Sequence, residues 1–260
     1  MVKVIAIVCQ KGGVGKTTTT VNLGIGLAHL GKKVLLLDLD SQASLTDSLG
    51  FTDSKIFSET SASIVNKIIA DTPIDTQKGL LKHKEGVYLL PTTSDLAATE
   101  IHLAKAIGRE FIVREYIEQV SMDFDYILID TQPTLGLLTI NALASADRVI
   151  IPVQAEFLAA KGLVQLLKTV FRVQRCINKA LKISGILLTM VNERTNDAKE
   201  ITRSIRNAYG SQIRIFTSIP RSVKVSECSK YGCSIYQNAP NSKAAEAYQA
   251  LAVEVASREK

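Results

Sequence analysis

The chain has 260 residues, of which 46% are hydrophobic, and its formal net charge is +6. This length suits one α/β domain over residues 1–260, and no stretch is apolar over the length of a membrane span. The first predicted strand leaves no room for a secretory signal and the four cysteines form no metal or disulfide pattern, so we expect a cytoplasmic protein with reduced thiols. The positive charge favours an anionic partner such as nucleic acid, although many basic proteins only carry solvated lysines.

Apolar runs alternate with amphipathic stretches along the chain, which predicts an α/β fold: a doubly wound, mostly parallel sheet flanked by helices. The predicted strands are Val4–Val8, Val34–Leu37, Val87–Leu90, Tyr126–Ile129, Arg148–Val153, Ile183–Thr189 and Ile213–Phe216. The predicted helices are Thr17–Leu30, Ser61–Ala70, Ser94–Ile107, Glu110–Val120, Gly136–Ala144, Ala160–Asn178, Ala198–Ala208 and Lys243–Ser257. The polar segment Gly50–Ser61 is predicted as a loop.

A glycine-rich loop, Q-K-G-G-V-G-K-T-T, lies between the first predicted strand and the first predicted helix. An ordinary P-loop has a glycine where this chain has Gln10, and Lys11 comes next. The glycines let backbone N–H groups turn inward on an anion, and the helix start adds partial positive charge. Lys16 is expected to reach the β- and γ-phosphates, and Thr17 to hold Mg²⁺ through its hydroxyl. The predicted nucleotide-binding residues of this loop are Lys11, Gly12, Gly13, Val14, Gly15, Lys16, Thr17 and Thr18.

Carboxylates follow two of the predicted strands. Asp130 ends the run Y-I-L-I-D, which is typical of a Walker B element that holds Mg²⁺; the alternative is a carboxylate that only caps the following turn. Asp38 and Asp40 follow the second strand and point to the same side, so both are expected to face the phosphates, and one of them to orient the attacking water. An aspartate pair after a strand is also often an N-cap.

Three blocks resemble the deviant Walker A ATPases of the MinD/ParA superfamily, specifically its ParA/Soj branch: K-G-G-V-G-K-T-T, L-L-L-D-L-D and Y-I-L-I-D-T-Q-P. Further matching blocks lie at residues 139–143, 151–157, 187–195, 219–227 and 240–248. The resemblance implies an ATPase that uses ATP and Mg²⁺ to partition plasmid or chromosomal DNA. It also implies an ATP-sandwich homodimer that binds double-stranded DNA without sequence preference, associates with the nucleoid, and is stimulated in its weak hydrolysis by a ParB-type centromere-binding protein.

The resemblance also assigns roles to single residues. Lys11 matches the lysine that crosses the dimer interface to the partner's phosphates, and Asp40 the aspartate associated with water activation. The catalytic residues are then expected to be Lys11, Lys16 and Asp40, and the metal-associated residues Thr17, Asp40 and Asp130. Asn192 and Pro220, in two of the matching blocks, are expected to bind the nucleotide. The chain departs from the family pattern at Ser41, Ala43 and Ser44, where the family commonly reads Pro-Gln-Gly-Asn around Gln42. It departs again at Gln132, where a second proline is usual, and at Lys161, where glutamate is usual.

The paired lysines also have a physical rationale. Two ammonium groups side by side repel each other unless phosphates lie between them. A second lysine from a facing subunit would therefore make dimerisation depend on nucleotide. The alternative is that Lys11 points to solvent, as most lysines do.

The predicted DNA-binding residues come from two sources. Arg194 and Arg221 lie in the blocks that supply DNA-contacting arginines in Soj-like members. Lys199, Arg203 and Arg206 share one helical face, which can neutralise phosphates without reading bases. The alternative for this face is solvated charge. With the family resemblance we favour DNA binding, and Arg194 and Arg221 over this helical face. The remaining basic candidates are Arg214, Lys224 and Lys230.

Three other classes of nucleotide-binding protein fit the sequence less well. A MinD-like membrane-cycling ATPase needs a terminal membrane-binding helix, but Ala244–Ser257 is alanine-rich and is predicted to pack rather than insert. An iron–sulfur reductase needs cysteines at a dimer axis, and a bacterial tyrosine kinase needs a terminal tyrosine cluster. Because the first strand begins near Lys3, we expect no N-terminal helix-turn-helix domain.

Overall fold

A computed structural model describes the backbone of residues 2–155, 159–192 and 195–257. Within these residues, seven strands form one sheet in the order β3-β4-β2-β5-β1-β6-β7. The strands are β1 (Lys3–Ile7), β2 (Val34–Leu39), β3 (Leu81–Lys82), β4 (Tyr88–Leu90), β5 (Tyr126–Thr131), β6 (Arg148–Gln154) and β7 (Lys182–Thr189). Neighbouring strands pair in parallel except β3, which pairs antiparallel with β4, so the predicted doubly wound sheet is confirmed.

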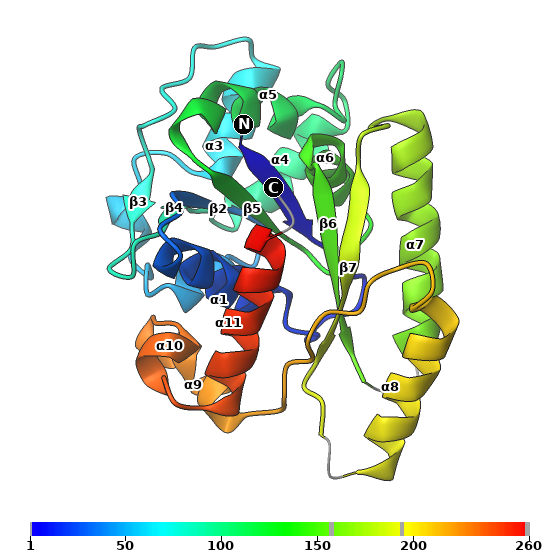
Figure 1. The fold of residues 1–260 in the computed structure, drawn as a ribbon. Helices are drawn as coiled ribbons and strands as arrows, with labels where there is room; N and C mark the ends of the chain where they lie inside the picture. The colour runs from blue at the N-terminus through cyan, green and yellow to red at the C-terminus, as the bar shows by residue number, and fades with distance from the viewer. Residues whose placement is uncertain (1, 156–158, 193–194, 258–260) are drawn as a thin grey trace.

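The central strands are buried on both faces because helices cover both sides of the sheet (Figure 1). Every residue of β2 and β5 is buried, which explains why their sequences are nearly continuous apolar runs. One face packs against α1, α9, α10 and α11, and the other against α3 to α8. The longer helices are α1 (Lys16–His29), α3 (Ser61–Ile69), α4 (Asp95–Leu103), α5 (Ile112–Val120), α6 (Leu137–Ser145), α7 (Ala159–Cys176), α8 (Asn196–Tyr209), α9 (Val223–Tyr231) and α11 (Lys243–Ala256).

The strand register places the polar strand ends side by side. Ile7 and Asp38 each lie opposite Asp130 in the neighbouring strands. The carboxyl ends of β1, β2 and β5 therefore meet at one edge, where a doubly wound sheet forms its ligand crevice.

One predicted strand was wrong. Residues Ile213–Phe216 make only an isolated bridge, in which the backbone of Ile186 bonds to Arg214 and Phe216. The chain does not continue as a regular strand. Thr217 donates both its backbone N–H and its hydroxyl to the carboxylate of Glu254 on α11, and the next backbone bond to β7 comes from Ile219, three residues after Phe216, to the carbonyl of Leu188.

Several short elements were not predicted. The polar segment 50–61 contains a 3₁₀ turn, η1 (Ser54–Ile56), and α2 (Ser44–Ser48) and α10 (Ile235–Asn238) are helices of one turn. The predicted helix Ser94–Ile107 ends early as α4, at Leu103, before Gly108 adopts a positive φ of 65°. A second 3₁₀ turn, η2 (Ser121–Asp123), extends α5.

Candidate nucleotide-binding site

The glycine-rich loop joins the end of β1 to the start of α1, as the sequence predicts. Gly15 is the residue before the helix and has a left-handed φ of 85°, a conformation that costs glycine little and other residues more. Among the described residues, no side chain caps this helix end. The first N–H groups of α1 are therefore available to an anion, and the helix dipole favours negative charge there.

The two lysines of the loop are placed differently. Lys16 is buried, with 7% of its surface exposed, and its Nζ donates to the carbonyl of Lys11 over 3.5 Å. Lys11 itself is exposed. The loop thus turns one ammonium group inward toward its own anion site and leaves the other at the surface.

Asp130 is fully buried and contacts the start of α1. Its Oδ2 accepts a hydrogen bond of 2.7 Å from the hydroxyl of Thr17, and its Oδ1 accepts one of 3.3 Å from Thr20. Burial, and then the negative charge of Asp38, raise the pKa of Asp130 to about 7, while the bond from Thr17 and the charge of Lys16 oppose that rise. The carboxylate therefore faces the phosphate loop, and neither hydrogen bond caps the following turn. Thr20 was not predicted, although it lies one helical turn after Thr17.

Asp38 and Asp40 have separate partners. The carboxylate of Asp38 accepts from the backbone N–H and hydroxyl of Thr46, at 2.9 and 2.7 Å, and from the N–H of Asp40. Burial raises its pKa to about 6. Asp38 thus holds the first turn of α2, which matches the N-cap alternative rather than the expectation that it faces the phosphates. Asp40 is 7% exposed and accepts a 3.0 Å bond from the N–H of Gln42.

The departures near Asp40 have a structural consequence. Ala43 precedes α2 with a φ of 52° and a ψ of 28°, in the left-handed region. Glycine is usual at this position in the resembled family, and an alanine there is strained because its Cβ crowds the backbone.

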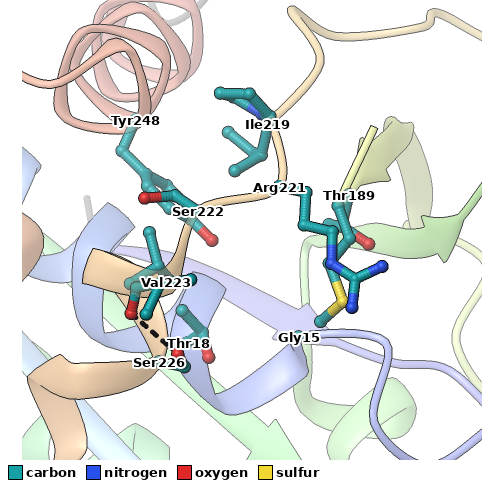
Figure 2. A pocket seen from close by; sticks show the side chains of 12 residues that line it. Gly15, Thr18, Thr189, Ile219, Arg221, Ser222, Val223, Ser226 and Tyr248 are labelled. Carbon is teal, nitrogen blue, oxygen red and sulfur yellow. Dashed lines mark hydrogen bonds between the residues drawn. The ribbon is translucent and has the colours of Figure 1, made fainter. Parts of the chain in front are cut away.

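A pocket of about 290 Å³ lies beside the phosphate loop (Figure 2). The loop and α1 contribute Gly15 and Thr18, the end of β7 contributes Thr189 and Met190, and α11 contributes Tyr248. The remaining wall consists of Ile219, Pro220, Arg221, Ser222, Val223, Val225 and Ser226. The pocket therefore continues the anion site into a partly apolar cavity, as a nucleotide with a base requires.

Hydrogen bonds fix the pocket to the loop on both sides. Thr189 donates to the carbonyl of Val14 over 2.8 Å, which joins β7 to the phosphate loop. The amide of Asn22 donates to the carbonyl of Thr18, and its oxygen accepts from the N–H of Ile235 at the start of α10. The loop is thus held by β7, and the helix that follows it, α1, is held by α10.

Among the residues predicted to bind nucleotide outside the loop, Pro220 lines this pocket and Asn192 does not. Thr189, Met190 and Tyr248 line it and were not predicted. Tyr248 lies on the last helix, which was predicted to pack, and only the fold shows that this residue reaches the pocket beside the phosphate loop.

The predicted DNA-binding residues are distributed over two surfaces. Lys199, Arg203 and Arg206 are exposed on α8 and line one surface hollow of about 660 Å³, so the predicted shared face is confirmed. Arg221 lies instead in the wall of the pocket, and Figure 2 shows its side chain extending toward the side where Gly15 and Thr189 lie. Arg194 lies outside the described residues.

The other basic candidates have partners of their own. Lys224 on α9 pairs with Glu227 over 3.0 Å, Arg214 forms an ion pair with Glu254, and Lys230 lies over the ring of Tyr231. A cation that is already paired with a carboxylate binds a phosphate less readily. We therefore regard α8 as the better anion-binding surface.

Two negative findings concern the described residues. None of their helices has the length and apolarity needed to cross a bilayer, and they contain no group of three or more His, Cys, Asp or Glu residues arranged to hold a metal ion. All four cysteines are free.

A protein-family model described as an AAA domain matches residues 2–183. The sporulation initiation inhibitor protein Soj of Bacillus subtilis is 44% identical over 258 residues, which cover 98% of this chain and 99% of that protein. The chromosome-partitioning ATPase Soj of Thermus thermophilus is 40% identical over 257 residues, covering 99% and 96% of the two chains. A cobyrinic acid a,c-diamide synthase structure from Mycobacterium smegmatis, with bound ADP and magnesium, has a TM-score of 0.83 and 34% identity, covering 97% of this chain and 93% of that one.

These similarities extend over nearly the whole chain and agree with the geometry of the phosphate loop. The resemblance expected from the motifs is thereby confirmed: the chain belongs to the ParA/Soj-type ATPases of the MinD/ParA family.

Proposed function

We propose that this chain, as one ATPase domain over residues 1–260, hydrolyses ATP in order to partition plasmid or chromosomal DNA. The observation that carries the proposal is the bonded pair of Thr17 and Asp130 beside a buried Lys16, at an uncapped helix start. Lys16 and Asp130 are buried charged residues, and the pKa of Asp130 is strongly raised, which is typical of functional sites. The relatives named as chromosome-partitioning ATPases support the DNA role.

The residues present fit ATP with Mg²⁺. The Thr17 hydroxyl and the Asp130 carboxylate are hard oxygen ligands of the kind that Mg²⁺ prefers, directly or through water. Lys16 and the first N–H groups of α1 would hold the phosphates, and the adjoining pocket would take the base and ribose. Magnesium, when bound, would neutralise part of the negative charge on the phosphates.

Asp40 is the proposed residue that orients the attacking water. It follows β2 at the edge formed by β2 and β5, and its Oδ1 accepts from the N–H of Gln42. An aspartate in this place can hold a water in line with the phosphate, and the remaining catalysis is positioning and charge neutralisation.

Lys11 is the proposed link between nucleotide and dimer. Its exposure next to an inward-facing Lys16 supports a role toward the phosphates of a second subunit. Because like charges repel without the anion between them, the homodimer would form with ATP and separate after hydrolysis.

DNA binding is proposed for Lys199, Arg203 and Arg206 on α8, together with Arg221, Lys224 and Arg194. A patch of exposed cations without base-reading geometry binds phosphates without sequence preference and in a salt-dependent way. We further propose weak hydrolysis stimulated by a ParB-type protein, and a cytoplasmic, nucleoid-associated location.

The alternative, a MinD-like membrane-cycling ATPase, finds less support. The apolar face of α11 carries Ala245, Tyr248, Leu251, Ala252 and Val255, and all five are buried against the core. A face that already packs inside the protein is not available for insertion into a bilayer.

The test is DNA binding measured with no nucleotide, with ADP and with ATP, each with magnesium and at several salt concentrations. We expect binding only with ATP. Equal binding in all three states would indicate a constitutive basic patch and contradict dimer-gated binding. Co-sedimentation with anionic liposomes, run in parallel, would support the membrane alternative if ATP-dependent binding appeared there.

A further inference from the structure

The segment that follows β5 lies directly over the phosphate loop. It runs from Gln132 to Gly136 and leads into α6. The hydroxyl of Thr131 donates to the carbonyl of Ile7 over 2.9 Å, which fixes the start of the segment to β1. A Cβ placed on Gly12 would lie 4.0 Å from the Cβ of Pro133, so the two loops are in contact range.

One carboxylate, that of Glu100 on α4, holds both ends of this segment. Its two oxygens accept from the side-chain amide of Gln132 at 3.2 and 3.1 Å. Oε1 also accepts from the backbone N–H of Leu138, in the first turn of α6, over 3.4 Å. A Cβ on Gly136 would lie 2.8 Å from the same oxygen, so the backbone at Gly136 runs close to the carboxylate of Glu100.

Glu100 therefore acts as a cap that comes from another helix. The residue before α6 is Gly136, which offers no side chain, and the first turn of α6 contains no acidic residue. A carboxylate at a helix N-terminus satisfies unpaired N–H groups and interacts favourably with the helix dipole. Here the same carboxylate also binds Gln132, two residues after Asp130.

The partner residue stands at a position where this chain departs from the resembled family pattern. Where the resembled family usually has a proline, this chain has Gln132. A proline fixes its own backbone, whereas a glutamine does not and has a side-chain N–H₂ to donate. In this chain, the hydrogen bonds between Gln132 and Glu100 thus restrain the backbone where a proline ring would otherwise do so.

We infer that Glu100 is a positioning residue for ATP hydrolysis, which sets the place of the Gln132–Gly136 segment over the phosphate loop through Gln132 and Leu138. The inference rests on the proposed ATPase function. It concerns the rate of hydrolysis and not nucleotide affinity, because Glu100 bonds to the segment and not to the loop or pocket residues that would hold the nucleotide.

The test exchanges the two side chains of the Gln132–Glu100 pair by mutation. Q132E places two carboxylates against each other and removes the amide donor. Adding E100Q restores one donor and one acceptor between the same positions, and leaves an amide oxygen for the N–H of Leu138. The matched control is Q132E with E118Q, which has the same net charge as the reversed pair and changes an exposed carboxylate on α5.

Two quantities are measured: hydrogen exchange of residues 132–138 in the nucleotide-free protein, and kcat and KM for ATP with magnesium. We expect Q132E to raise exchange and lower kcat by about tenfold each, with KM changed less than about twofold, since one buried bond is replaced by repulsion. The reversed pair is expected to return exchange and kcat to within about threefold of the original, as contact partners do in a double-mutant cycle. The control pair is expected to stay at the Q132E values.

A reversed pair that is no better than the control, or a Q132E protein with unchanged exchange, would overturn the inference. A change in KM alone would also overturn it, because it would place Glu100 in nucleotide binding. If the original protein hydrolyses no ATP, the proposed function fails, and the exchange measurement still decides whether Glu100 positions the segment.

Discussion

The phosphate-loop edge of the sheet and the basic face of α8 carry their charges in opposite ways. At the sheet edge, Lys16 and Asp130 are buried among hydrogen-bond partners, and Asp38 lies beside them. On α8, Lys199 and Arg203 are exposed above a wide hollow.

The difference shows what each surface can select. Buried charges act through fixed geometry, and moving one by a small distance changes the chemistry. The binding strength of exposed charges depends on their total number, is reduced by salt, and changes little when single side chains move. The first surface suits one ligand held in one pose, and the second suits a repeating polyanion.

The largest effect is expected from Asp40→Ala. Without the carboxylate that orients water, hydrolysis should fall by about 10²–10⁴-fold, while ATP-dependent dimerisation and DNA binding persist. The measurement is phosphate release next to light scattering and DNA binding. Asp47→Ala, an exposed carboxylate on α2, serves as the control. Normal turnover in the Asp40 variant would remove that residue from the mechanism.

The complementary change is Arg203→Ala with Arg206→Ala. We expect DNA affinity to fall by about tenfold or more and the salt dependence to lose about one ion per cation, with ATP turnover in the absence of DNA unchanged. Lys84→Ala, on the turn between β3 and β4 at the other edge of the sheet, controls for general charge loss. An unchanged salt slope would mean that α8 is only solvated charge.

Arg221→Ala tests a residue that is predicted to bind DNA but lines the pocket beside the phosphate loop. We expect DNA affinity to fall by about tenfold, as for one lost phosphate contact, while ATP-dependent dimerisation is retained. Because Arg221 lines the pocket, ATP affinity is measured on the same samples. A loss confined to ATP affinity would move this residue from the DNA surface to the nucleotide site.

The buried carboxylates also predict a dependence on pH. The pKa of Asp130 is raised to about 7 in the folded protein from an ordinary value of 3.8, so the folded state favours the protonated form. The stability that this supplies is complete below about pH 4 and is lost as pH rises through 7. Asp130→Asn, which cannot ionise, should therefore be increasingly more stable than the original nucleotide-free protein between pH 5 and 8. Urea unfolding at several pH values measures this, and a constant difference between the two proteins would contradict it.

The smallest effect is expected from Ala43→Gly. Relief of the left-handed backbone should stabilise the protein by about 1 kcal/mol. Ala97→Gly, at an exposed position inside α4, should destabilise it by a similar amount, about 1 kcal/mol. Thermal unfolding distinguishes the two signs, and equal destabilisation would mean that Ala43 is not strained.

The sequence predicted those parts of the site that depend on one segment at a time. The loop before α1 and the carboxylate after β5 each have a local pattern, and parallel pairing brings them together at the sheet edge. Alternation along β2 could not separate Asp38 from Asp40, because their roles depend on whether Thr46 folds back to meet the first of them.

The pocket wall was harder to predict for the same reason. Met190 and Tyr248 come from β7 and α11, and only the packing of α11 against α1 brings a core-like tyrosine to the nucleotide site. The strand predicted at Ile213–Phe216 has a suitable apolar pattern, but Thr217 bonds to Glu254, far along the chain, and the pairing with β7 shifts register before it resumes at Ile219.

The wall formed by α9 is attached at both of its ends. Before it, the N–H of Arg221 donates to the carbonyl of Val191 over 3.1 Å; after it, Asn22 bonds to Ile235 over 2.8 Å. A helix held before its first turn and after its last is less free to swing than a lid attached by one hinge. Its middle is held as well, because Cys228 is buried in the core, so we expect a nucleotide to enter beside a wall that keeps its shape.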